Sequence, residues 1–153
     1  MLKQVLVAGA LVAAAACAPQ PASNAPDRGG VMPIALVEPY VEIHDALALD
    51  SLDGVSAKAG AVAAAAATVG APAADVRTAA ALLAEATDIN DARTKFATLS
   101  DAVIAYQTDQ QLELPDGVRV AVCPMIQKPW MQRGDTITNP YYGSSMLTCG
   151  DFK

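Results

Sequence analysis

The 153-residue sequence is poor in aromatic side chains and in basic residues. It has seven aromatic residues, ten Lys and Arg against 16 Asp and Glu, and a formal net charge of -6. So few large side chains argue against a large all-β sandwich or a large α/β catalytic domain. Nucleic-acid-binding proteins neutralise phosphates with clustered Lys and Arg, so this charge balance also argues against a nucleic-acid partner.

The sequence also lacks the short motifs that mark common enzyme classes. It has no glycine-rich phosphate-binding loop, no paired-histidine metal motif and no strand-to-helix nucleophile motif. The single histidine, His44, lies beside the apolar face of an expected helix, where a buried imidazole with satisfied hydrogen bonds is the simplest interpretation. A Cys–His catalytic pair requires a spatial contact that a sequence does not show. We therefore expect a protein that is not an enzyme.

The N-terminus has the features of a bacterial export signal. The apolar run at residues 5–16 follows Lys3 and is too short to span a bilayer. It ends in Ala-Ala-Ala-Cys at residues 14–17, which resembles the lipobox whose cysteine is lipidated after cleavage. We expect residues 1–16 to be a lipoprotein signal peptide and Cys17 to anchor the protein to a membrane.

The position after Cys17 bears on the location of the anchored protein. It holds Ala18, which by resemblance to lipoprotein sorting rules favours the periplasmic side of the outer membrane. The alternative is an ordinary secretory signal cleaved near Ala16 or Ala18. Residues 17–37 are rich in proline and are expected to form a tether between the anchor and the folded domain.

Alanine is the most abundant residue, with 33 copies, and the middle of the chain has helical periodicity. We expect four helices. The first begins at Pro39, and the second runs through the alanine-rich stretch to about Thr68. The third covers about residues 73–86, and the fourth begins after Asp88. The last helix has the clearest apolar stripe, at Ala92, Phe96, Leu99, Val103 and Tyr106. These features predict a mainly α fold, an antiparallel bundle of about four helices in a single domain over residues 38–153. A short β-prone, loop-rich C-terminal cap is expected at about residues 117–153.

The expected cap concentrates soft sulfur ligands. Thiolate and thioether sulfur suit Cu(I) or Ag(I) far better than Mg²⁺ or Ca²⁺. A tryptophan face can also hold a cation. The candidate metal ligands are Cys123, Met125, Met131, Met146 and Cys149, with Trp130 as a supporting contact.

Each of these residues has a structural interpretation as well. Cys123 and Cys149 can form a disulfide in an oxidising compartment, closing a loop of about 27 residues and stabilising the fold by roughly 3–4 kcal/mol. The methionines can fill irregular gaps in the core. Trp130 can be a packing anchor for the cap. Both interpretations of the cysteines remain open at this point.

Four motifs carry a family resemblance. They are Cys-Pro-Met at residues 123–125, Trp130, Asn-Pro-Tyr-Tyr-Gly at 139–143 and Met-Leu-Thr-Cys-Gly at 146–150. In this order they resemble a bacterial domain of unknown function that occurs alone in periplasmic proteins. The same domain is fused to the C-terminus of periplasmic adaptors of copper/silver efflux pumps. The resemblance covers about residues 38–153 and implies that heavy-metal handling is a plausible function.

The sequence therefore leaves two hypotheses. The first is a membrane-anchored periplasmic lipoprotein that binds or buffers Cu(I) or Ag(I) and is linked to metal efflux. The second is a metal-free protein-interaction module, held by a Cys123–Cys149 disulfide, that docks on a heavy-metal efflux adaptor or another envelope protein.

Overall fold

The computed structural model describes residues 29–153. It contains four α-helices and a small antiparallel sheet in the C-terminal region, as the mainly α prediction required. Cys17 and the predicted signal peptide lie outside the described residues. Within residues 29–153, no helix has the length and apolar character needed to cross a membrane.

The folded part begins earlier than the sequence indicated. Strand β1 (Gly30–Val31) pairs in parallel with β2 (Leu112–Glu113), and helix α1 spans Ile34–Ala48. Met32, Leu36 and Val37 are buried in the core. Residues 30–37 are therefore part of the fold rather than of the predicted tether, because they supply apolar side chains that the small core needs. Pro39 accordingly lies inside α1 and not in its first turn.

The next three helices follow the sequence pattern closely. They are α2 (Val55–Val69), α3 (Ala74–Ala84) and α4 (Ile89–Asp109), with a short 3-10 turn, η1 (Ala71–Ala73), before α3. Asp88 caps α4, as predicted, by accepting hydrogen bonds from the backbone N–H groups of Asn90 and Asp91. All five residues of the predicted apolar stripe on α4 are buried.

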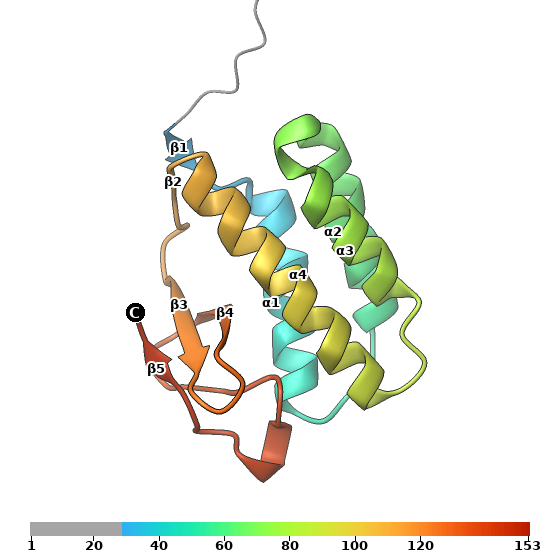
Figure 1. Cartoon of the computed structure of the whole chain (residues 1–153), viewed down its shortest axis with the longest axis vertical. Coiled ribbons are helices and arrows are strands. Elements are labelled where there is room, and N and C mark those ends of the chain that lie inside the picture. The colour runs from blue at the N-terminus through green and yellow to red at the C-terminus, as the bar shows by residue number, and fades with distance from the viewer. Residues whose placement is uncertain (1–28) are drawn as a thin grey trace, which may run out of the picture.

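The sheet joins three strands in the order β4-β3-β5. Strands β3 (Val118–Cys123) and β4 (Lys128–Arg133) form a hairpin, and β5 (Asp151–Phe152) pairs with the other edge of β3. A 3-10 turn, η2 (Gly143–Ser145), lies in the connection from β4 to β5. Figure 1 shows α1 and α4 between this sheet and the α2–α3 pair, so the cap covers one side of the helices.

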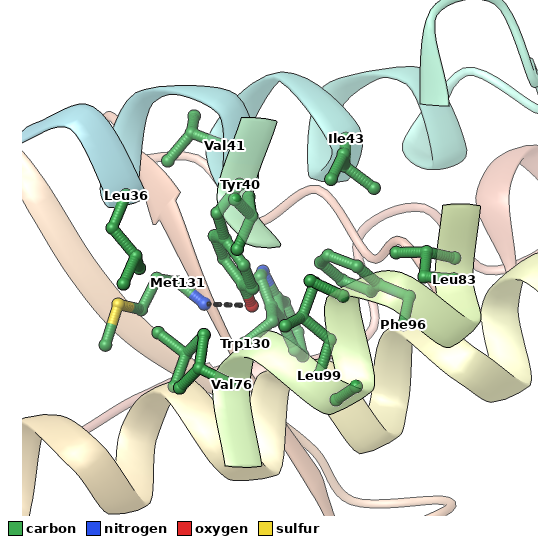
Figure 2. Close-up of a cluster of buried hydrophobic side chains, with 14 of the residues drawn as sticks. Leu36, Tyr40, Val41, Ile43, Val76, Leu83, Phe96, Leu99, Trp130 and Met131 are labelled. Atoms are coloured by element: carbon green, nitrogen blue, oxygen red, sulfur yellow. Dashed lines mark hydrogen bonds between the residues drawn. The ribbon is translucent and has the colours of Figure 1, made fainter. Parts of the chain in front are cut away.

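Aromatic side chains join the cap to the helices. Tyr40 stacks on Phe96 with ring centroids 5.1 Å apart, Phe96 meets Tyr141 at 6.0 Å, and Tyr141 meets Trp130 edge-on at 5.8 Å. The Tyr40 hydroxyl bonds with Ser100 Oγ at 2.6 Å and accepts from the backbone N–H of Met131 at 3.2 Å (Figure 2). More than half of the aromatic residues thus form one continuous core between α1, α4 and the cap.

Candidate functional site

The two cysteines of the cap are neighbours in space, although 26 positions separate them in the sequence. Cys123 is the last residue of β3 and is fully buried, and Cys149 precedes β5 and is partly exposed. Strand β3 pairs with β5 through Ala121–Phe152 and Val122–Asp151, and this ladder ends one residue before Cys123 and two residues after Cys149. The Cys123 thiol lies close enough to act on the Cys149 thiol. Both cysteines are free thiols in this structure.

The surroundings of Cys149 favour its protonated form. Loss of solvent around the side chain, followed by the neighbouring Cys123 thiol, raises the pKa of Cys149 above its usual value. A thiol held in this way is a poor nucleophile near neutral pH, because the thiolate is the reactive form. In general, a protonated thiol binds a metal ion only when the ion displaces its proton.

Asn139 positions the segment that carries Cys149. Its side chain is fully buried; Nδ2 donates to the Cys149 carbonyl oxygen at 2.6 Å, and Oδ1 accepts from the Tyr141 backbone N–H at 2.8 Å. The Asn139 backbone N–H also donates to the Leu147 carbonyl oxygen. The Asn-Pro-Tyr-Tyr-Gly motif therefore has a structural role: it fixes the chain on both sides of Cys149.

The three cap methionines lie in different surroundings. Met125 lies in the turn after Cys123 with 62% of its surface exposed, and Met146 is partly exposed in the turn before Cys149. Met131 is fully buried. It pairs with Val120 across the hairpin, whereas Cys123 pairs with Lys128, so Met131 and Cys123 lie on opposite faces of the sheet.

Met131 and Trp130, two of the expected metal-contacting residues, lie in the core. Figure 2 shows the Met131 side chain near Leu36 and Val76 in the core.

Trp130 is fully buried, contacts Tyr141 edge-on and donates from Nε1 to Gln132 Oε1 at 2.9 Å. A Cβ atom at Gly150 would lie only 2.5 Å from the indole ring, so the chain passes directly over Trp130. Both Met131 and Trp130 therefore pack as core residues among neighbouring side chains and backbone.

An ion pair that the sequence analysis did not identify fastens the cap to the helices. Arg93 on α4 donates from Nε to the Pro140 carbonyl oxygen and from Nη2 to the Leu47 carbonyl oxygen and Asp50 Oδ1. Asp50 Oδ2 in turn accepts from the backbone N–H of Ser144 in η2. We call Arg93, Asp50 and Ser144 the cap latch. Hydrogen bonds from Ser144 first and Arg93 second lower the pKa of Asp50 to about 2.

Gly143 shows how tightly the cap latch is packed. It has a φ of +54°, and a Cβ atom there would collide with Asp50 and Arg93. The glycine of the Asn-Pro-Tyr-Tyr-Gly motif was a sequence signal for a tight turn here. A sequence does not show which carboxylate and guanidinium the glycine approaches.

His44 has its hydrogen bonds satisfied inside the fold, as the sequence predicted. It is 1% exposed; its Nε2 donates to the Thr138 carbonyl oxygen at 2.7 Å, and its Nδ1 lies 2.8 Å from Asp45 Oδ1. Both ring nitrogens thus have oxygen partners. His44 therefore ties α1 to the loop after β4.

A metal site built from the residues usual for zinc or calcium does not occur in the described part of the chain. Residues 29–153 contain no group of three or more His, Cys, Asp or Glu placed to share an ion. The arrangement that remains is a pair of thiols with two thioethers on nearby turns. Sulfur ligands in general suit soft monovalent ions better than hard cations.

Comparison with other proteins assigns the helical part of the chain to a family. Neither the curated proteins nor the solved structures include a significant match. A family model does match residues 36–113, which run from the first turns of α1 to the end of β2 and precede every candidate ligand in the cap. Because this match covers just over half of the sequence, the chain belongs to a family described as proteins of unknown function (DUF3347).

Proposed function

We propose that this protein is a membrane-anchored periplasmic lipoprotein that binds or buffers a soft monovalent metal, Cu(I) or Ag(I). The observation that carries the proposal is the meeting of Cys123 and Cys149 at the end of the β3–β5 ladder. Two thiolates can bind Cu(I) without further protein ligands.

The nearby methionines extend the proposed ligand set. Met146 and Cys149 belong to one tight turn, in which the Cys149 backbone N–H donates to the Met146 carbonyl oxygen at 3.0 Å. Met125 is two residues after Cys123 and is exposed, so its thioether can move toward an ion at no cost in core packing. The primary ligands are therefore Cys123 and Cys149, with Met125 and Met146 as thioether ligands.

The cellular setting of the proposal comes from the sequence. The lipobox-like residues 14–17 support a lipid anchor at Cys17, and Ala18 supports the outer membrane of a bacterium. The four cap motifs support a link to heavy-metal efflux through their resemblance to the domain of copper/silver efflux adaptors. We further propose that the helices form an antiparallel bundle that serves as a scaffold, since consecutive helices pack on one another through short connections.

A Cu(I) titration tests this function. The chain from residue 18 onward, reduced and free of oxygen, competes for Cu(I) with a chromophoric chelator. We expect one ion per chain and loss of tight binding in Cys123→Ser and in Cys149→Ser. Met131→Leu is the matched control, because its buried sulfur lies on the opposite face of the sheet. Unchanged affinity in both cysteine variants would refute the proposal.

The second candidate function is a metal-free interaction module held by a Cys123–Cys149 disulfide. The full burial of Cys123 favours it, because a buried thiol is shielded from a metal donor. In this function the cap docks on an efflux adaptor or another envelope protein. Thiol labelling of protein taken directly from the periplasm distinguishes the two: a permanent disulfide supports the module, and two labelled thiols support the metal site.

A further inference from the structure

A second site lies on the helix side of the cap, apart from the cysteine pair. It is an open pocket of about 450 Å³ bounded by α4, the tip of the β3–β4 hairpin and the Asn-Pro-Tyr-Tyr-Gly segment. The hairpin and α4 lie side by side in Figure 1. A volume of this size falls in the range of pockets that hold small organic ligands.

One part of the lining is apolar and aromatic. The lining includes Tyr141 and Tyr142, Ile126 at the hairpin tip and Ala97 of α4. Ile126 remains 39% exposed although it is a large apolar side chain. Covering these groups with an apolar ligand body would remove them from water.

All charged side chains in the lining of the pocket are basic. Arg93 and Lys128 are its two ionisable cations, and no carboxylate lines the pocket, although acidic residues outnumber basic ones by 16 to 10 in the sequence. Their carboxylate partners, Asp50 and Asp101, lie outside the lining. The hydrogen bonds of Arg93 use Nε and Nη2, which leaves the N–H groups of Nη1 available among the described contacts.

From this combination we infer that the pocket binds a small amphipathic carboxylate, with an aromatic or aliphatic body against Tyr141, Tyr142 and Ile126. The carboxylate accepts hydrogen bonds from Lys128 Nζ and Arg93 Nη1. A charge-assisted bond of this type is stronger than a neutral one, and it selects an anion over an uncharged molecule of the same shape. The inference is independent of the metal proposal, since it uses none of the sulfur ligands.

A pair of matched probes tests the pocket. Reduced, metal-free protein from residue 18 onward is titrated with phenylacetate and with 2-phenylethanol, which has a similar shape but no charge. Amide chemical shifts in a ¹H–¹⁵N spectrum report both the site and the affinity. We expect saturable shifts around Thr94, Ile126 and Tyr142. Phenylacetate should bind at least about tenfold more tightly, a ratio that one charge-assisted hydrogen bond can supply.

Matched variants separate binding at the pocket from general effects. Lys128→Gln should weaken the binding of phenylacetate about tenfold and leave the affinity for 2-phenylethanol unchanged. Lys58→Gln should alter neither affinity. It is a matched control because both lysines are about two-fifths exposed and ion-paired. Thr98→Trp should abolish binding by filling the pocket. Thr68→Trp is its control, because Thr68 is also an exposed helical threonine bonded to the carbonyl four residues earlier.

Three results would overturn the inference. One is the absence of saturable shifts up to about 10 mM phenylacetate, the weak end expected for a ligand of about ten heavy atoms. Another is equal affinity for the charged and the neutral probe. The third is unchanged phenylacetate binding in Thr98→Trp.

Discussion

Asn139 donates a hydrogen bond from Nδ2 to the main-chain carbonyl oxygen of Cys149 at 2.6 Å, ten residues along the chain. The Asn139 side chain is fully buried, so it cannot exchange this partner for water. The bond links the Asn-Pro-Tyr-Tyr-Gly motif to the motif that contains Cys149. It explains how an irregular connection can hold a thiol beside the end of a regular strand.

Replacement of Asn139 should therefore weaken the fold. Asn139→Ala leaves the Tyr141 N–H and the Cys149 carbonyl oxygen without their partner, and we expect a loss of about 2–4 kcal/mol in the free energy of unfolding. Urea denaturation followed by circular dichroism measures this value. Asn90→Ala, at an exposed position in the first turn of α4, should change it by less than about 0.5 kcal/mol. Equal effects of the two variants would contradict the assigned role.

The Tyr40 hydroxyl is a second polar group on which the cap depends. Burial raises the pKa of Tyr40, and the hydroxyl bonds with Ser100 while accepting from the Met131 N–H. Tyr40→Phe leaves both partners buried and unpaired, so we expect a loss of about 1–3 kcal/mol by chemical denaturation. Tyr142→Phe is the control, since none of the described hydrogen bonds involves its hydroxyl, and it should be nearly neutral.

The cap latch should make stability sensitive to acid. The pKa of Asp50 is lowered from 3.8 to about 2 in the folded protein by hydrogen bonds from Ser144 and then Arg93. Because the folded value lies below the unfolded one, the contribution of Asp50 is present above about pH 4. It is lost as the pH falls toward about 2, where the folded carboxylate takes up its proton.

Variants isolate this acid dependence. Thermal unfolding of the wild type should show a falling midpoint between about pH 4 and 2, and Asp50→Asn should show a smaller fall from a lower starting value. Asp53→Asn, at a nearby exposed position, should keep the wild-type profile. A profile for Asp50→Asn that parallels the wild type would show that Asp50 does not contribute.

The proposed metal site should also depend on pH. The raised pKa of Cys149 means that a metal ion must displace its proton near neutral pH, so metal binding releases a proton. We expect Cu(I) affinity to rise with pH, by up to about one order of magnitude per pH unit for this thiol. Competition with a chelator of known pH dependence, between about pH 6 and 8, measures this slope. An affinity independent of pH would exclude Cys149 as a ligand.

Much of the helical part could be predicted from local sequence. Asp88 caps α4, the break at residue 70 precedes α3, and the stripe from Ala92 to Tyr106 faces the core. These features were predictable because helix periodicity and capping depend on residues a few positions apart. The start of the fold was placed too late. Gly30 and Val31 become a strand only through pairing with residues 112–113, a contact that no local pattern shows.

The sequence by itself determined the helical content, the turn at Asn139 and the concentration of sulfur in the last 37 residues. It did not determine which sulfur atoms meet. Pairing of β3 with β4 and β5 brings Cys123 to Cys149 and directs Met131 to the opposite face. Successive side chains on a strand alternate between faces, so a ligand set drawn from a strand depends on its register with distant partners, which only the tertiary structure decides.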